Sequence, residues 1–191
     1  MEYEPLLTGT RWQILELLSE KRQSPLEISI RIKTTLANVS QQLRLLEVAG
    51  LVKTEKLRQR DKGKPRILYS IADDFGYIVL AAPGSARKSL LSLTFHQKLT
   101  LSLWHVAPSD LHGPAGAFLT KFDEYSQRID AIYFSKKFDE LCIVTDAKEL
   151  KKLDGQSITS KCISKILDLK DIRQKTDSII LLHKRTEVLQ V

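Results

Sequence analysis

The sequence predicts a protein of the α+β class, with helices and strands in partly separate blocks. Apolar residues recur at helical spacing through most of the first 50 residues, and two β-like runs follow them. Beyond residue 83, helical and strand patterns alternate, which is typical of a small α/β domain. We therefore expect two domains, 1–75 and 84–191, with the Pro-Gly-Ser stretch at 83–85 as their boundary.

Three helices are expected in the first 50 residues. Apolar residues recur at helical spacing between 8 and 20, and Ser24 followed by Pro25 suits the start of a second, short helix. The third helix is expected over 35–48, ending at Gly50, a residue favoured just past a helix end. On a helical wheel its buried stripe comprises Leu36, Val39, Leu43 and Leu46.

A basic hairpin is expected to follow the third helix. The β-like runs LVKTEKLRQ and RILYSIA flank residues 60–65, whose Gly63 and Pro65 suit a turn. The segment 53–66 holds seven basic and two acidic residues, most of the net charge of +7. Such a concentration of charge indicates a polyanionic partner. Three helices followed by a basic hairpin is the element order of a winged helix-turn-helix.

The second half of the sequence predicts helices that alternate with strands. A capping box at 94–97 opens a helix through about residue 106, with Trp104 expected in the core. A loop over 108–114 and an amphipathic helix over 115–128 follow. Strands are expected at 129–134 and 140–146, a helical segment at 147–153, and a last strand within 178–184. Cys142 and Cys162 are too few for a disulfide framework, so we expect reduced, buried thiols.

The polar face of the third helix has the chemistry of a DNA-reading surface. A helix in the major groove needs small residues where it approaches the duplex and hydrogen-bonding side chains in its N-terminal half. Gln41 suits adenine and Arg44 suits guanine or a phosphate, while the hairpin bases suit the backbone. A solvated helix face beside a solvated basic loop is the alternative. The residues predicted to contact DNA are Thr35, Ala37, Ser40, Gln41 and Arg44 on the helix and Arg58, Arg60, Lys62, Lys64 and Arg66 on the hairpin.

The stretch PLEISIRIKTTLANVSQQLRLLEVAGLVKTEK resembles the ArsR-like winged helix family of transcriptional regulators. The pattern is carried by Thr35, Val39, Ser40, Leu43, Leu46, Ala49, Gly50, Leu51 and Val52. The resemblance spans about residues 8–75 and implies a homodimer that binds double-stranded DNA at a pseudo-palindromic operator. Many members sense metals through cysteines in the second helix or through Asp, His and Glu clusters. Because 25–32 contains neither cysteine nor histidine, we expect no metal and no cofactor.

Two other functions stay open. The run from 115 to 146 weakly resembles a degenerate minimal nucleotidyltransferase fold, but it lacks the Gly-Ser turn, and Asp139 and Glu140 occupy adjacent positions that point to opposite faces of a strand. An enzyme with a winged accessory domain is therefore one alternative, and a winged helix serving as a protein-interaction module is the other. The prediction is a DNA-binding regulator that is not an enzyme. Without a signal segment or an apolar stretch of about 20 residues, we expect it to be cytoplasmic with no membrane contact.

Overall fold

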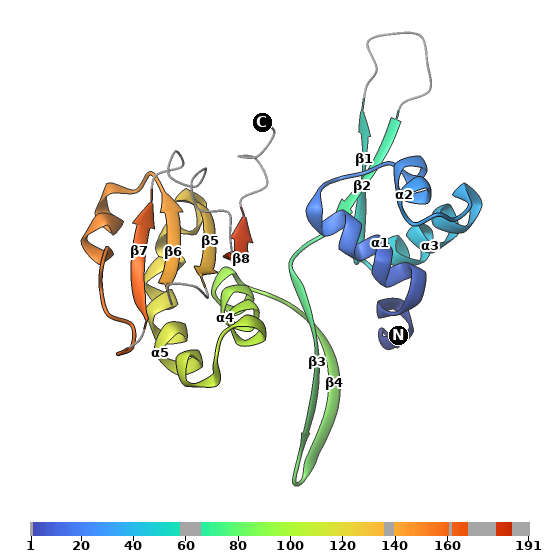
Figure 1. Cartoon of the computed structure of the whole chain (residues 1–191). Coiled ribbons are helices and arrows are strands. Elements are labelled where there is room, and N and C mark those ends of the chain that lie inside the picture. Colours follow the sequence, from blue (N-terminus) through green and yellow to red (C-terminus); the bar gives the residue numbers. More distant parts are fainter. Residues whose placement is uncertain (1, 58–65, 136–139, 161, 168–178, 185–191) are drawn as a thin grey trace. The chain divides into compact units, whose positions relative to one another are not determined.

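The computed structural model describes residues 2–57, 66–135, 140–160, 162–167 and 179–184. The chain divides into two compact units, Met1–Ser92 and Leu93–Val191, each with its own elements (Figure 1). The first unit opens with helices and the second is built on a mixed sheet, so the predicted α+β class is confirmed.

Three helices form the core of the first unit. After a short 3-10 turn, η1 (Glu4–Leu7), they are α1 (Gly9–Glu20), α2 (Pro25–Arg31) and α3 (Leu36–Val48). Their inward residues and the start of the next strand form one buried cluster of Ile14, Leu15, Leu18, Ile28, Val39, Leu43, Leu46, Leu51 and Val52. Leu36 is the exception to the predicted stripe, since it is 48% exposed. As the first residue of α3 and at the edge of the stripe, it lies outside the contact with α1 and α2.

Local capping fixes where these helices begin. Ser24 and Glu27 form a capping box at α2, with Pro25 in the first turn as predicted. At α3 the Thr35 hydroxyl accepts from the Asn38 N–H at 3.2 Å. A side-chain acceptor therefore satisfies one of the free N–H groups at the start of α2 and at the start of α3.

Schellman motifs end both α2 and α3. At α2, Lys33 donates to the Ile30 carbonyl and Thr34 to the Ser29 carbonyl, with Lys33 at φ 55°. At α3 the equivalent position is Gly50, with φ 73°. A left-handed conformation is costly for lysine and free for glycine, so the two turns have the same geometry at different cost.

The wing is a two-stranded antiparallel hairpin of β1 (Val52–Leu57) and β2 (Arg66–Ile71). Its register runs from Val52 opposite Ile71 to Leu57 opposite Arg66. Gln23, between α1 and α2, exchanges both backbone hydrogen bonds with Tyr69 and so joins the helices to β2. The predicted hairpin tip lies in 58–65, outside the described residues.

A second hairpin, hereafter the ribbon, consists of β3 (Phe75–Ala82) and β4 (Ser85–Ser92). The strands pair over their full length, from Phe75 opposite Ser92 to Ala82 opposite Ser85 (Figure 1). The sequence predicts a domain boundary at 83–85, but Pro83 and Gly84 form the turn of this hairpin, and the two units divide at residue 92. Proline and glycine are common both in tight turns and in linkers between domains. Composition alone therefore does not distinguish the two, which explains the difference.

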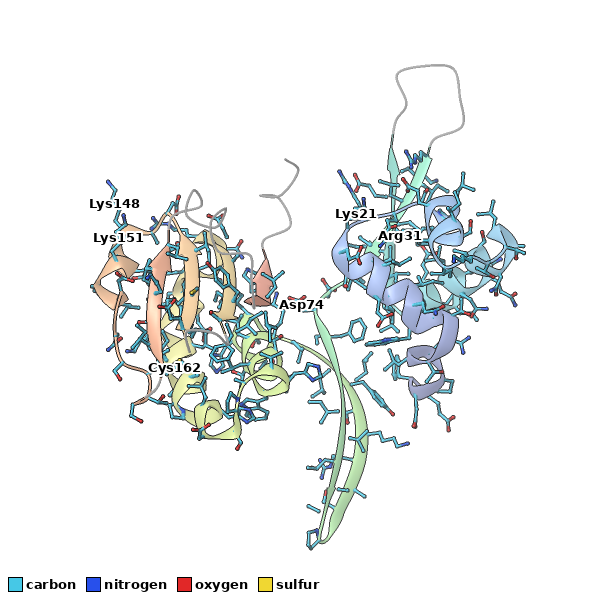
Figure 2. All side chains as sticks on the ribbon, viewed as in Figure 1. Lys21, Arg31, Asp74, Lys148, Lys151 and Cys162 are labelled. Atoms are coloured by element: carbon cyan, nitrogen blue, oxygen red, sulfur yellow. The ribbon has the colours of Figure 1, made fainter. Side chains whose placement is uncertain are left out.

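The second unit packs helices on a four-stranded sheet in the order β7-β6-β5-β8. The strands are β5 (Ile129–Ser135), β6 (Glu140–Thr145), β7 (Ile163–Leu167) and β8 (Ile179–Lys184), of which only the β6–β7 pair is parallel. The helical elements are α4 (Phe95–Val106), α5 (Ser109–Leu119) and the 3-10 segments η2 (Thr120–Arg128) and η3 (Lys148–Leu153). Residues of α4, α5, η2 and the sheet share one apolar core. Both cysteines are buried, and Figure 2 labels Cys162.

Three expectations for this unit need correction. Residues 109–114 of the predicted loop at 108–114 belong to α5, and the predicted helix at 115–128 is divided between α5 and η2. Burial of Leu111, Ala115 and Phe118 outweighs the low helix propensity of Gly113 and Pro114. The sequence pattern does not predict β7 at all. Trp104 is 52% exposed and stacks on His112, with ring centroids 5.9 Å apart, rather than anchoring the core.

Exchanging residue types at the two Schellman turns should change stability in opposite directions. Lys33→Gly removes the left-handed strain of lysine and should raise the free energy of unfolding by roughly 0.5 kcal/mol. Gly50→Ala introduces that strain and should lower it by roughly 1 kcal/mol. Urea titration followed by circular dichroism measures both. Lys21→Gly is the control, because Lys21 has an extended φ of −166° and should gain nothing.

Candidate nucleic-acid interface

One face of α3 presents the predicted DNA-contacting side chains to solvent. Thr35, Ala37, Ser40, Gln41 and Arg44 are all exposed. From residue 37 onward their spacing of three, four and seven positions places them on one side of the helix. The opposite side carries Val39, Leu43 and Leu46, each with 0% exposure. We call Thr35, Ala37, Ser40, Gln41 and Arg44 the contact face of α3.

Hydrogen bonds beside the contact face fix α3 against α1. The Gln42 side chain accepts from Arg11 Nη1 at 2.9 Å and donates to Asn38 Oδ1 at 3.2 Å. Arg11 also donates to the Pro5 carbonyl at 2.8 Å. Asn38 in turn donates to the Thr34 hydroxyl at 3.1 Å. This chain of polar contacts holds the flank of α3 and leaves the contact face uninvolved. No sequence pattern singles out Gln42, Asn38 or Arg11.

Ion pairs tie the base of the wing to the helices. Arg66 Nη2 lies 2.6 Å from Glu27 Oε1, which joins β2 to the start of α2. Arg22 Nη1 lies 2.8 Å from Glu55 Oε2, which joins the turn before α2 to β1. Arg66 is therefore engaged by a carboxylate in this structure. The other predicted wing residues, Arg58, Arg60, Lys62 and Lys64, lie outside the described part of the chain.

Glu27 is the most perturbed acid of this region. Its pKa is lowered to about 2, first by the Ser24 backbone N–H, then by the Ser24 hydroxyl, and to a smaller extent by Arg66. Both Ser24 donors contact Glu27 Oε2, at 2.8 and 2.7 Å. One carboxylate thus caps α2 through one oxygen and holds the wing through the other.

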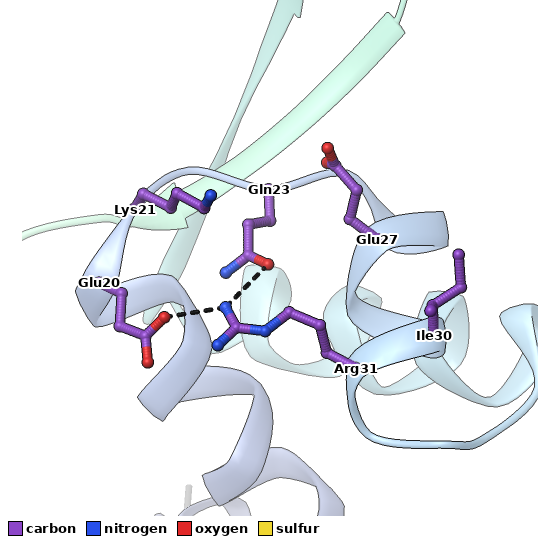
Figure 3. Close-up of a pocket in the computed structure, with 6 residues that line it drawn as sticks. All are labelled: Glu20, Lys21, Gln23, Glu27, Ile30 and Arg31. Atoms are coloured by element: carbon purple, nitrogen blue, oxygen red, sulfur yellow. Dashed lines mark hydrogen bonds and ion pairs between the residues drawn. The ribbon is translucent and has the colours of Figure 1, made fainter. Parts of the chain in front are cut away.

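A shallow hollow between the end of α1 and α2 contains a polar brace (Figure 3). Arg31 Nη1 donates to Glu20 at 2.8 Å and to Gln23 Oε1 at 3.3 Å. Gln23, which is 2% exposed, also donates to the Leu17 carbonyl at 2.6 Å. Because Gln23 also pairs with β2 through its backbone, the brace connects α1, α2 and β2. No sequence signal distinguishes this glutamine from a surface one.

The residues considered for metal binding or catalysis do not come together in the described structure. Within the described ranges, no three His, Cys, Asp or Glu side chains lie close enough to hold a metal ion. Glu140 opens β6 and lies 4.0 Å from Lys165 Nζ, whereas Asp139 falls in the 136–139 gap. Among the described helices, none is long and apolar enough to cross a membrane.

Three helices followed by a β-hairpin, with an exposed polar face on the third helix, define the winged helix-turn-helix class of DNA-binding proteins. Residues 8–54 match the model of the family described as "Bacterial regulatory protein, arsR family". The match covers α1, α2, α3 and the start of β1, and it confirms the resemblance found in the sequence. The chain therefore carries an ArsR-type helix-turn-helix, the domain of a DNA-binding transcription regulator.

The remaining comparisons are less informative. No curated protein matches the chain. A solved structure titled "Structure of Prokaryotic Transcription Factors" is 13% identical, covering 88% of this chain and 98% of that one, with a TM-score of 0.28. The assignment of class thus rests on the family match and on the order of the elements.

Acid should destabilise the first unit through Glu27. Its lowered pKa contributes stability that is complete above the ordinary value of 4.5 and is lost as the pH falls toward 2. Glu27→Gln should therefore flatten the dependence of melting temperature on pH between about 5 and 2.5. Arg66→Gln should keep most of this pH dependence, since Ser24 lowers the pKa of Glu27 more than Arg66 does. Equal slopes for wild type and Glu27→Gln would contradict this assignment.

Proposed function

We propose that this protein is a cytoplasmic, sequence-specific regulator of transcription that binds double-stranded DNA with α3 in the major groove. The observation that carries the proposal is the contact face of α3, which is exposed and polar on the third helix of an ArsR-type domain. The major groove, about 12 Å wide, admits an α-helix. It also presents a distinct hydrogen-bonding pattern for each base pair.

Each residue of the contact face has a proposed role. Ala37 and Ser40 are short and allow the helix to approach the base edges, where Ala37 can contact a thymine methyl group. Gln41 pairs through its amide with adenine, and Arg44 reaches guanine or a phosphate. Thr35 uses its hydroxyl as an acceptor within the cap, which leaves its hydrogen for a phosphate oxygen.

The wing is proposed to bind the DNA backbone. Arg58, Arg60, Lys62, Lys64 and Arg66 neutralise phosphates and set the register of the protein on the duplex, without reading sequence. Arg66 contacts Glu27 through Nη2, and a guanidinium has further N–H donors with which to bind a phosphate.

Two copies of the chain are proposed to act on one operator. In a homodimer the two α3 helices are related by a two-fold axis. The two half-sites of a palindromic operator are related by the same kind of axis, so each α3 can bind one half-site. Residues 93–191 are proposed to serve oligomerisation or the sensing of a signal. No catalytic step is assigned to them.

Truncation of the reading side chains should reduce affinity for a selected duplex. After enrichment of bound sequences from random DNA, Gln41→Ala and Arg44→Ala should each lose roughly 1–3 kcal/mol of binding and relax the preference at one base position. Fluorescence anisotropy with enriched and scrambled duplexes measures both effects. Gln13→Ala, an exposed glutamine on α1, is the control. Unchanged binding by both α3 variants would favour a protein-interaction module instead.

The wing should determine the salt dependence of binding. Replacing Arg60, Lys62 and Lys64 with Gln should reduce the slope of log K against log salt by roughly 0.9 for each phosphate that the variant no longer neutralises. Base preference should be unchanged, since phosphate contacts carry no sequence information. The control removes the same charge from η3, at Lys148, Lys151 and Lys152. An equal fall in slope for the two triple variants would show that net charge, rather than the wing, is responsible.

A further inference from the structure

In the described part of the chain, much of the apolar surface of the ribbon is exposed. In its register, Phe75, Tyr77 and Leu90 share one face, since Tyr77 lies opposite Leu90. Phe75 and Leu90 pack against the helical core of the first unit. Further along β3 the consecutive side chains of Ile78, Val79 and Leu80 are 36%, 61% and 47% exposed. Because neighbours on a strand point to opposite faces, this apolar run is exposed on both sides of the ribbon.

A two-stranded ribbon of this kind lacks the means to stabilise itself. Isolated hairpins are at best marginally stable in water, and three or more strands or a packed helix are usually needed. Here only the end of the ribbon near Phe75 and Leu90 reaches the core. Among the described residues, β3 pairs with β4 alone, so the backbone groups along its other edge have no strand beside them.

The two free edges of the ribbon differ in charge. β4 carries Arg87 and Lys88, and Lys88 forms an ion pair with Glu4. Charged residues of this kind protect edge strands from pairing with other chains. β3 has the sequence FGYIVLAA over eight residues, without a charge, a proline or a register shift. The unprotected edge is therefore that of β3.

Charge also indicates which partner this edge accepts. When two copies of one strand pair about a two-fold axis, the residues near the axis lie beside their own copies, so charged residues there would oppose like charges. β4 is excluded from such pairing by Arg87 and Lys88, whereas a neutral, apolar strand meets its copy without repulsion. The edge of β3 is thus suited to a second copy of this chain.

We propose that two copies of the chain associate through antiparallel pairing of their β3 strands, which makes the two ribbons a four-stranded sheet. A two-fold axis perpendicular to the sheet keeps equivalent faces on the same side. An axis at Val79 places Val79 beside its copy and Ile78 beside Leu80 of the other chain, on the opposite face. The inference places the homodimer of the proposed function on the ribbon and rests on that part of it. Of the two roles proposed for residues 93–191, it leaves them the sensing of a signal.

Opposite charges at position 79 provide the test, using the full chain and sedimentation equilibrium without DNA. Wild type should sediment at twice the chain mass of 21.8 kDa. Val79→Lys and Val79→Glu should each raise the dimer dissociation constant roughly 100-fold or more, because like charges meet across the axis. An equimolar mixture of the two variants should restore the dimer. Val48→Lys is the control, since Val48 is an exposed valine outside the ribbon.

Three results would overturn the inference. The first is a wild type that is still monomeric at about 100 µM. The second is a dimer that persists in both charged variants, and the third is an equimolar mixture of the two variants that stays monomeric. Circular dichroism of each variant separates a failure to associate from a failure to fold. The proposed reading of DNA by α3 is tested independently: if it is wrong, Gln41→Ala leaves the anisotropy unchanged, whatever the oligomeric state. If both proposals are right, monomeric Val79→Lys still binds a single half-site, and adding Gln41→Ala to it weakens that binding.

Discussion

The burial of one apolar stripe on α3 is the constraint on which the first unit depends. Val39, Leu43 and Leu46 have no exposed surface, and burying each side chain contributes about 1.5–3 kcal/mol. Because the helical period is fixed, the same burial turns Ser40, Gln41 and Arg44 toward solvent. The contact face therefore needs no separate stabilisation, since its orientation follows from packing on the other side.

Polar contacts then join the wing to this helical core. Gln23 is buried, pairs with β2 through its backbone, and is held by Arg31 and by the Leu17 carbonyl. Removing a buried partner of this kind leaves an unsatisfied group, which costs about 1–3 kcal/mol. The surface ion pairs of Arg66 and Arg22 contribute less, because exposed pairs are worth roughly 0–1 kcal/mol. Among these polar contacts, those of Gln23 contribute most to the placement of the wing beside α3.

Local patterns predicted the first unit better than the second. The cap at Ser24, the buried stripe of α3 apart from Leu36, and the end of α3 at Gly50 are each encoded within a few residues, and the structure shows them. The exposure of the contact face could be predicted for the same reason. Gln23, α5 and β7 depend on partners far along the chain: β7 is a five-residue strand that gains its parallel neighbour only when β6 is in place. Leu36 and Trp104 show that an apolar residue alone does not predict burial.

The two hairpins of the first unit share a geometry but differ in edge chemistry, and this difference separates their proposed partners. The segment 53–66 concentrates positive charge, so it repels its own copy and attracts a polyanion. β3 has no charge and gains nothing from phosphate, but it tolerates its own copy at close range. The proposed function requires both DNA and a second copy of the chain, and this division assigns them to different hairpins. Salt then weakens the first contact by screening and leaves the second, apolar one largely intact.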